Sequence, residues 1–503
     1  MADVRRVPQR RRAALWDRPG DSEGIGLTDP ANLRAQALDL ERQMAPLEPS
    51  SSDRRAIGGQ VLDHALRFLD EVEQAPSYRP AGEAFDRRFD PEFSANGRTV
   101  DDVLDFIATT VDQPGIATTS PRFMGYIPGG GLFQSGLGDL LAAVSNKYAG
   151  FATAGPGAVR IENACVDFLR DAVGFPEGAA GTLTTGGSIA NLTAIVAARE
   201  ALDPDGGGAI YTTLYAHYCV DKALKIAGRG RSPHRKIATD AKTRMRVDAL
   251  REALERDVAD GIRPWLIVAS AGTIDMGAIE PLEEIAALAR EFGAWFHIDG
   301  AYGGLFALCD EGRSKLHGIA LADSIALDPH KTMFLPYGTG AVLVRNGALL
   351  AEALGHDAEY IRPFGEADVG PSPANLSIEL TRHFRAMRLW LPLQLAGIDA
   401  FKAAQTEKLL LARYFHARLT EFPAIDPGPE PDLSVVAFRY RSGDAAGERL
   451  MEILQQRGRV MLSGTRIDGT YYLRAAILCF RTHAAHIDEA IAAIGDALAT
   501  LDG

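Results

Sequence analysis

The sequence lacks the features that would place the protein in a membrane, on nucleic acid or in an oxidising compartment. It contains no run of about 18 apolar residues, so we expect neither a membrane span nor a membrane partner. Its formal net charge is −13 at pH 7, which argues against nucleic acid as a partner. Its four cysteines lie far apart and form no CxxC pair. They predict a reducing, cytoplasmic location, no disulfide framework and no metal site.

The composition is that of a globular protein with more than one domain. Hydrophobic residues make up 46% and charged residues 24% of the 503 residues, a length that suits two or three domains. Residues 1–115 are predicted to form an extended tail and helices too few for a core of their own, which would pack on another surface such as a second subunit. A large α/β domain is expected over residues 116–398, and a smaller α+β domain over residues 399–503.

Apolar strands and amphipathic helices alternate between residues 182 and 345, which predicts an α/β sheet with helices on its faces. The expected strands are 182–185, 210–214, 265–269, 294–298, 324–327 and 341–344. A further helix is expected over residues 378–395. Residues 356–377 contain three prolines and two glycines and show little periodicity. We expect them to form a loop that closes over a bound substrate.

A lysine lies at a bend between two of the apolar strands. Residues 325–327 and 341–344 are apolar, and His330 and Lys331 occupy the polar corner that follows the first of them. Burying an ammonium group is costly unless the charge is paired or neutralised. One interpretation is a lysine that reaches back to the surface from a strand end. The other is a lysine that binds a carbonyl compound as a Schiff base.

Three other strand ends carry candidate ligand-binding side chains. Gly186, Gly187 and Ser188 join a strand to a helix, where free N–H groups suit a phosphate, although an ordinary glycine turn with a serine cap has the same pattern. Asp299 follows another strand and could hold a proton on a heterocyclic nitrogen, or only make a turn. His217 follows a third strand and could stack on a ring or have a structural role.

The four strand ends together are more specific than any one of them. A phosphate cup, an aromatic partner for a ring, a carboxylate and a lysine follow one another along the chain. These groups would hold the phosphate, the ring face, the pyridine nitrogen and the aldehyde of pyridoxal 5'-phosphate. The sequence therefore predicts a site for this cofactor.

The chain resembles the group II pyridoxal-phosphate-dependent amino acid decarboxylase family, most closely its aromatic-L-amino-acid decarboxylase branch, from about Leu38 to the C-terminus. The motifs that carry the resemblance are Pro121-Arg-Phe-Met-Gly-Tyr-Ile-Pro, Gly186-Gly-Ser-Ile-Ala-Asn, Ala216-His217, His297-Ile-Asp-Gly-Ala-Tyr, Asp328-Pro-His-Lys and Leu473-Arg-Ala-Ala-Ile. The resemblance implies the PLP-dependent fold type I (aminotransferase-like), with a mainly parallel sheet in the large domain and a smaller α+β C-terminal domain. It also implies a homodimer with active sites at the subunit interface.

The resemblance further implies roles for individual residues. Lys331 would form the Schiff base, Asp299 would pair with the pyridinium, and His217 would stack over the ring, so these three are the catalytic candidates. The other cofactor-contacting positions would be Gly187 and Ser188 at the phosphate, Ala301 against the ring, and His330 and Thr273 nearby. Candidates for an apolar substrate pocket, or equally for an interface core, are Phe123, Tyr126, Ile127 and Phe151.

Two positions depart from the family pattern. The family usually carries a tyrosine in the loop after the lysine, thought to protonate the substrate carbon, and residues 356–377 place none there because Tyr360 lies too early. Gly129 stands where relatives often have a threonine that contacts the substrate carboxylate. The groups that protonate the carbon and bind the carboxylate are therefore left open.

The sequence supports three hypotheses about function. The first is decarboxylation of an L-amino acid, aromatic or else acidic or diamino (glutamate or 2,4-diaminobutyrate), to the amine and carbon dioxide. The second couples decarboxylation to oxidative deamination and yields an aldehyde, because a carbanion that is not promptly protonated could react with oxygen. The third is a non-catalytic cofactor-binding scaffold, against which the intact set of Lys331, Asp299 and His217 argues.

Overall fold

The computed structural model describes residues 29–82, 85, 93, 95–355 and 370–502. The predicted N-terminal tail and most of the predicted substrate-closing loop, with Tyr360, lie outside these residues. The chain divides by its internal contacts into two units, one of residues 1–67 with 94–105 and one of residues 68–93 with 106–503. Each unit is described by itself. None of the described helices is long and apolar enough to cross a lipid bilayer.

The first unit is built from helices whose side chains remain exposed or half-buried. α1 (Pro30–Gln43) begins after Asp29, whose carboxylate accepts the N–H of Ala31 at 3.1 Å. α2 (Ser51–Glu71) and α4 (Val100–Ile107) follow, with the 3-10 turn Ala45–Leu47 between α1 and α2. Neither α1 nor α2 has a buried residue. Among the described residues, the apolar side chains of these two helices are therefore not buried in a hydrophobic core.

A seven-stranded sheet forms the centre of the second unit. Its order is β3-β9-β8-β7-β6-β4-β5, in which β9 runs antiparallel to both neighbours and the other pairs are parallel. The strands are β3 (Ala180–Thr184), β4 (Ala209–Thr213), β5 (His234–Ile237), β6 (Pro264–Ser270), β7 (Trp295–Gly300), β8 (Ser324–Leu327) and β9 (Gly340–Val344). The prediction of a mainly parallel α/β sheet is confirmed.

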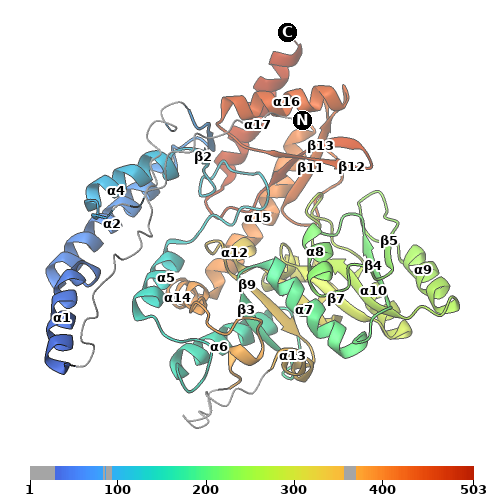
Figure 1. Cartoon of the computed structure of the whole chain (residues 1–503). Coiled ribbons are helices and arrows are strands. Elements are labelled where there is room, and N and C mark those ends of the chain that lie inside the picture. Colours follow the sequence, from blue (N-terminus) through green and yellow to red (C-terminus); the bar gives the residue numbers. More distant parts are fainter. Residues whose placement is uncertain (1–28, 83–84, 86–92, 94, 356–369, 503) are drawn as a thin grey trace, which may run out of the picture. The chain divides into compact units, whose positions relative to one another are not determined.

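Helices cover both faces of this sheet, so its central strands are buried along their whole length. Every residue of β6 and β7 is buried. Successive side chains of a strand point to opposite faces, and accordingly Ile267 belongs to one hydrophobic cluster while Leu266 and Val268 belong to another. The first cluster includes residues of α6 (Pro156–Ala172), α9 (Val247–Ala259) and α10 (Leu282–Phe292), and the second includes residues of α7 (Gly187–Leu202), α8 (Tyr218–Ile226) and α13 (Gly347–Leu354) (Figure 1).

The C-terminal part of the second unit has its own small sheet and hydrophobic cluster. The order of its antiparallel strands is β10-β11-β13-β12. The elements are α15 (Ile398–Leu419), β10 (Ile425–Asp426), β11 (Val435–Tyr440), α16 (Asp444–Arg457), β12 (Ser463–Ile467), β13 (Thr470–Ala476) and α17 (Ala484–Asp502). This arrangement confirms a smaller α+β C-terminal part.

The remaining elements connect or flank the two sheets. α5 (Phe133–Ser145) packs along α14 (Ala386–Ala396), and β1 (Tyr78–Arg79) pairs with β2 (Gly115–Ile116). α11 (Asp310–Lys315) and the one-turn helix α12 (Pro329–Thr332) lie on either side of β8 in the sequence. α12 is the element that carries Lys331.

The helix predicted over residues 378–395 was placed too early at its N-terminal end. α14 begins at Ala386, because the preceding residues leave the helical path to make buried ion pairs. Arg382 is 6% exposed and donates to Glu162 at 2.7 Å and to Thr182 at 3.1 Å. Arg385 pairs with Glu379 at 2.6 Å. Apolar periodicity alone did not indicate that these arginines are held inside the protein.

Candidate active site

The carboxyl ends of the parallel strands meet at one edge of the large sheet and enclose a cavity of about 280 Å³. Open α/β sheets bind ligands at this edge. All of the predicted cofactor-contacting residues line the cavity: Gly187, Ser188, His217, Thr273, Asp299, Ala301, His330 and Lys331. The topology of the sheet thus brings together side chains from positions far apart in the chain.

The glycine corner between β3 and α7 gives the cavity an end lined by backbone. Gly186 has φ +149°, and a Cβ atom on Gly187 would lie 2.9 Å from Oδ2 of Asp328 and 3.0 Å from Cβ of Ala301. Only glycine fits such a close approach. The first N–H groups of α7 have no partner within the helix, so this end is electropositive and suits an anion.

Asp299 lies at the end of β7 and is 8% exposed. Its Oδ1 accepts the N–H of Ala301 at 3.2 Å, and its Oδ2 has a long 4.0 Å contact with the thiol of Cys219. Among the described residues these are weak or local partners. The carboxylate therefore keeps acceptor capacity for a ligand in the cavity.

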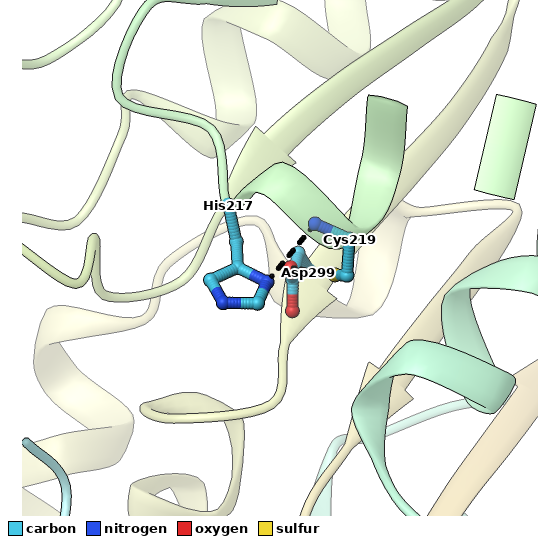
Figure 2. Close-up of side chains that lie close together, drawn as sticks. All are labelled: His217, Cys219 and Asp299. Atoms are coloured by element: carbon cyan, nitrogen blue, oxygen red, sulfur yellow. Dashed lines mark hydrogen bonds between the residues drawn. The ribbon is translucent and has the colours of Figure 1, made fainter. Parts of the chain in front are cut away.

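His217 caps the N-terminus of α8 with its ring beside Asp299, as Figure 2 shows. Its Nδ1 accepts the N–H of Cys219 at 3.3 Å. Burial lowers the pKa of His217 more than the nearby Asp299 carboxylate raises it. The imidazole is therefore neutral near pH 7, with its proton on Nε2, and can lie flat against an aromatic ring.

His217, Cys219 and Asp299 also offer donor atoms within 4.8 Å of one another, close enough for a metal ion (Figure 2). Burial, and then the Asp299 carboxylate, raise the pKa of the Cys219 thiol far above its usual range. Metal ions bind the thiolate rather than the thiol. The trio is therefore better suited to the nitrogen end of a heterocyclic ring than to a metal.

Lys331 lies on α12 and donates to Oδ2 of Asp328 at 3.0 Å. Burial lowers the pKa of Lys331, but the Asp328 and Asp299 carboxylates outweigh burial, so the pKa lies above its usual value. The amine is half-buried and faces the cavity. A lysine in such a place is held as an ammonium until it meets a reaction partner.

His330 and Thr273 complete the predicted set. His330 donates from Nδ1 to the carbonyl oxygen of Thr339 at 2.8 Å, and burial lowers its pKa. Thr273 is buried, and its hydroxyl oxygen accepts the N–H of Ala278 at 3.1 Å. Each side chain therefore keeps one polar atom available toward the cavity: Nε2 of the neutral histidine and the hydroxyl proton of the threonine.

Sequence reasoning missed four other residues that line the cavity. Asp328 and Cys219 contact Lys331 and Asp299, as above. Asn191 donates to the carbonyl oxygen of Gly187 at 2.8 Å and so orders the glycine corner. Tyr215 also lines the cavity and donates to Asp468 at 2.8 Å. Asp328 and Asn191 belong to the motifs Asp328-Pro-His-Lys and Gly186-Gly-Ser-Ile-Ala-Asn, so these motifs could have indicated that both residues line the cavity.

The residues predicted for an apolar substrate pocket do not line the cavity. Phe123 and Ile127 are buried, Phe151 is half-buried, and Tyr126 is 61% exposed with φ 51°. Phe151 stacks on Tyr148 with the ring centroids 6.0 Å apart. Their assignment to a substrate pocket stays a prediction.

Gly129 lies against the backbone of the lysine-bearing helix. A Cβ atom built on it would lie 2.1 Å from the carbonyl oxygen of His330. A threonine cannot take this place without moving α12. Position 129 therefore offers no side chain to bind a substrate carboxylate.

The residues of the cavity fit pyridoxal phosphate. A glycine corner at a helix N-terminus suits its phosphate, a buried carboxylate with weak partners suits its ring nitrogen, and a half-buried amine suits its aldehyde. A glycine corner, a histidine, a carboxylate and a lysine therefore surround one cavity in this protein. This set of groups places the protein in the class of pyridoxal-phosphate enzymes.

Comparison with known proteins agrees with this class. Residues 83–441 match the family model described as the pyridoxal-dependent decarboxylase conserved domain. The aromatic-L-amino-acid decarboxylase of Bacillus atrophaeus is 31% identical over 456 residues, which cover 87% of this chain and 93% of that protein. The L-2,4-diaminobutyrate decarboxylase of Rhizobium meliloti is 32% identical over 72% of this chain and 75% of its own.

A solved structure with the same fold is that of Catharanthus roseus tryptophan decarboxylase in complex with L-tryptophan. It is 25% identical, has a TM-score of 0.83, and the match covers 90% of this chain and 99% of that one. The chain therefore belongs to the pyridoxal-dependent decarboxylase family. It has the type I fold and is a pyridoxal-phosphate-dependent amino acid decarboxylase.

Proposed function

We propose that the protein decarboxylates an aromatic L-amino acid to the corresponding amine and carbon dioxide. The observation that carries the proposal is the placement of Lys331 and Asp299 at adjacent strand ends around one cavity with a glycine corner. The aromatic preference is supported by similarity to the aromatic-L-amino-acid decarboxylase of Bacillus atrophaeus and to tryptophan decarboxylase of Catharanthus roseus.

In this proposal each residue has one task. Lys331 holds the cofactor aldehyde, and Asp299 keeps a proton on the ring nitrogen. His217 lies on one face of the ring and Ala301 on the other. Gly187 and Ser188 hold the phosphate with the first N–H groups of α7, and Thr273 and His330 supply further polar contacts near them.

The bound cofactor supplies a ring that accepts the electron pair left when carbon dioxide departs. The chain supplies the charges that make the ring a good acceptor. Asp299 is buried beside two neutral groups, the Cys219 thiol and the His217 imidazole. Because neither group carries a positive charge, neither competes with the ring nitrogen for the negative charge of Asp299. A buried charge interaction of this kind is stronger than one in water.

We further propose a cytoplasmic homodimer with the division into residues 1–115, 116–398 and 399–503 given above. The exposed apolar side chains of α1 and α2 support a second subunit as their partner, because they include Leu33, Leu40, Val61 and Leu62. The four cysteines are free and buried, which suits a reducing compartment. Sedimentation of the full chain against one that begins at residue 73 tests the dimer.

The substrate is tested with a panel of L-amino acids by measuring released carbon dioxide together with the amine. The panel should include phenylalanine, tyrosine, tryptophan, glutamate and 2,4-diaminobutyrate. A preference of about tenfold or more in kcat/KM for an aromatic substrate is expected. A preference for 2,4-diaminobutyrate, the substrate in the name of the Rhizobium meliloti relative, would contradict the aromatic assignment.

A second candidate is decarboxylation coupled to oxidative deamination. It is favoured by the absence of a tyrosine at the expected place after Lys331 and by 26% identity to the phenylacetaldehyde synthase of Arabidopsis thaliana. The same panel distinguishes it, because this reaction yields aldehyde, ammonia and peroxide and consumes oxygen. Amine without peroxide would rule it out.

A further inference from the structure

Asp328 has no task in the function proposed above, yet it is one of the most enclosed charged groups in the cavity. It follows the last residue of β8 and is 3% exposed. Its Oδ2 lies 3.0 Å from Nζ of Lys331. Its Oδ1 has no hydrogen-bond partner among the described residues. A buried carboxylate with one unpaired oxygen needs a strong partner at the other.

The surroundings of Asp328 leave Lys331 as that partner. Nδ1 of His330 lies 3.6 Å from Oδ1, but it already donates to the carbonyl oxygen of Thr339, and burial lowers the pKa of His330, so the ring is neutral. On the other side lies the backbone of Gly187, close enough that a Cβ there would touch Oδ2. Neither neighbour offers a positive charge.

The one-turn helix α12 creates the pair. Pro329 takes its first position, where a missing N–H costs nothing, and the turn brings Lys331 back onto Asp328 at a spacing of three residues. Oppositely charged groups at this spacing hold one another, and burial from water strengthens their attraction. The geometry therefore favours the ammonium form of the lysine.

We propose that Asp328 is the counter-ion that keeps Lys331 protonated in the cofactor-free protein, and thereby restrains its amine from reacting with carbonyl compounds. An ammonium has no lone pair for attack, so the free amine appears only when the pair is disrupted. The inference rests on the proposed function only in taking Lys331 as the cofactor-binding amine. Asp328 is in this sense a positioning residue that acts through Lys331.

Other groups around Lys331 do not replace Asp328. Asp299 is the second carboxylate near the amine, and it also raises the pKa of Lys331, but no hydrogen bond joins the two among the described residues. The titratable groups whose charges act on Lys331, or feel its charge, are Asp328, Asp299, Cys219, His217, His330 and Tyr337. Apart from the two carboxylates, these groups are uncharged near pH 7: burial lowers the pKa of the two histidines, and the pKa of the thiol and that of the phenol lie above their usual values.

The test measures the reactivity of Lys331 in the full chain after its cofactor has been removed. The protein is labelled with acetic anhydride from pH 7 to pH 11, and acetylation of Lys331 is compared by mass spectrometry with that of exposed Lys222 in the same sample. Asp328→Asn should move the midpoint of the Lys331 profile down by at least one pH unit. At any pH below both midpoints, Lys331 would then react about tenfold faster or more.

Two further variants make the result specific. Asp328→Glu keeps the charge and should return the profile toward that of the unchanged protein. Asp323→Asn removes a half-buried carboxyl just before the same strand, where it accepts the N–H of Phe296 at 2.8 Å, and should leave the Lys331 profile in place. Circular dichroism and thermal unfolding establish that each variant is folded.

A profile for folded Asp328→Asn that overlays that of the unchanged protein would overturn the proposal. If this variant does not fold, the profile of the unchanged protein still tests the proposal. A Lys331 midpoint at or below that of Lys222 overturns the proposal, and a higher midpoint supports it. Neither outcome depends on turnover. A failure of the proposed function would show instead as no carbon dioxide from any amino acid in the panel.

Discussion

Asp299 and Asp328 stand at the ends of neighbouring parallel strands, yet they meet opposite surroundings. Asp299 is followed by Gly300 and Ala301, and its partners are a backbone N–H and a thiol. Asp328 is followed by a helical turn that returns Lys331 to it. The edge of the sheet supplies both carboxylates, and the next three residues decide which of them stays open for a ligand and which is neutralised. Each prediction below changes one side of this comparison.

The largest effect is expected for the cation itself. Lys331→Ala should reduce turnover by at least about a thousandfold, as loss of a covalent group usually does. It should also abolish the visible absorbance of cofactor bound to the lysine. Lys222→Ala, on the exposed side of α8, serves as control and should retain both. If Lys331→Ala still showed that absorbance, another lysine would be the cofactor-binding amine.

The next effect concerns the open carboxylate. Asp299→Asn keeps the shape of the side chain but removes the charge that holds a proton on the ring nitrogen, so kcat/KM should fall by about 100- to 1,000-fold. Cofactor content, measured after denaturation, should stay within about twofold. Asp323→Asn is the matched control, and near-full activity of Asp299→Asn would remove this residue from the mechanism.

The sequence predicts the large sheet well because its strands are buried on both faces. The predicted strand 324–327 coincides with β8, and the others differ by one or two residues. β5 and β12 were missed, since β5 (His234–Ile237) lies at an edge and is largely polar, and the burial of β12 (Ser463–Ile467) is only partial. Periodicity detects burial, so strands with little burial give little signal.

The strand ends predicted the residues that line the cavity, but not their partners. A residue at the carboxyl end of a parallel strand must lie at the ligand-binding edge. Which carboxylate meets which cation depends on the path of the following turn, and nothing in the spacing of Asp328 and Lys331 says that their charged atoms are 3.0 Å apart. The same holds for Cys219, since nothing in the sequence around it indicates that its thiol contacts Asp299.

His297, two residues before Asp299 on β7, should determine how far the pH can fall before the folded protein loses stability. His297 has no exposed surface; its Nε2 hydrogen-bonds to Asn191 at 2.7 Å and its Nδ1 to Ser324 at 2.8 Å. Burial lowers the pKa of His297 from 6.5 to about 4. The unfolded chain therefore binds the proton first as the pH falls, and stability that is present above pH 6.5 is lost toward pH 4.

The difference corresponds to about 3 kcal/mol between pH 7 and pH 4. His297→Asn cannot take up this proton, so its denaturant midpoint should fall less steeply over the same range even if it is lower at pH 7. The measurement is the free energy of unfolding in urea at each pH. Equal slopes for both proteins would show that His297 is not the group responsible.

The smallest effect is expected for the neutral partner of Asp299. The thiol of Cys219 is 4.0 Å from Oδ2 of Asp299 and accepts a contact from Nδ2 of Asn191 at 3.5 Å. Because burial raises the pKa of this thiol, the thiol is protonated and is a weak donor, and a neutral hydrogen bond contributes roughly 0.5–1.5 kcal/mol. Cys219→Ala should therefore lower kcat/KM by about two- to tenfold. Cys219→Ser should restore most of the lost activity because a hydroxyl is the stronger donor.

Cys309→Ala, which also removes a buried thiol but lies outside the cavity lining, controls for lost packing. A loss of about a hundredfold in Cys219→Ala with the cofactor retained would mean that Asp299 depends on this thiol as strongly as Asp328 depends on its ammonium, and the contrast between the two carboxylates would disappear.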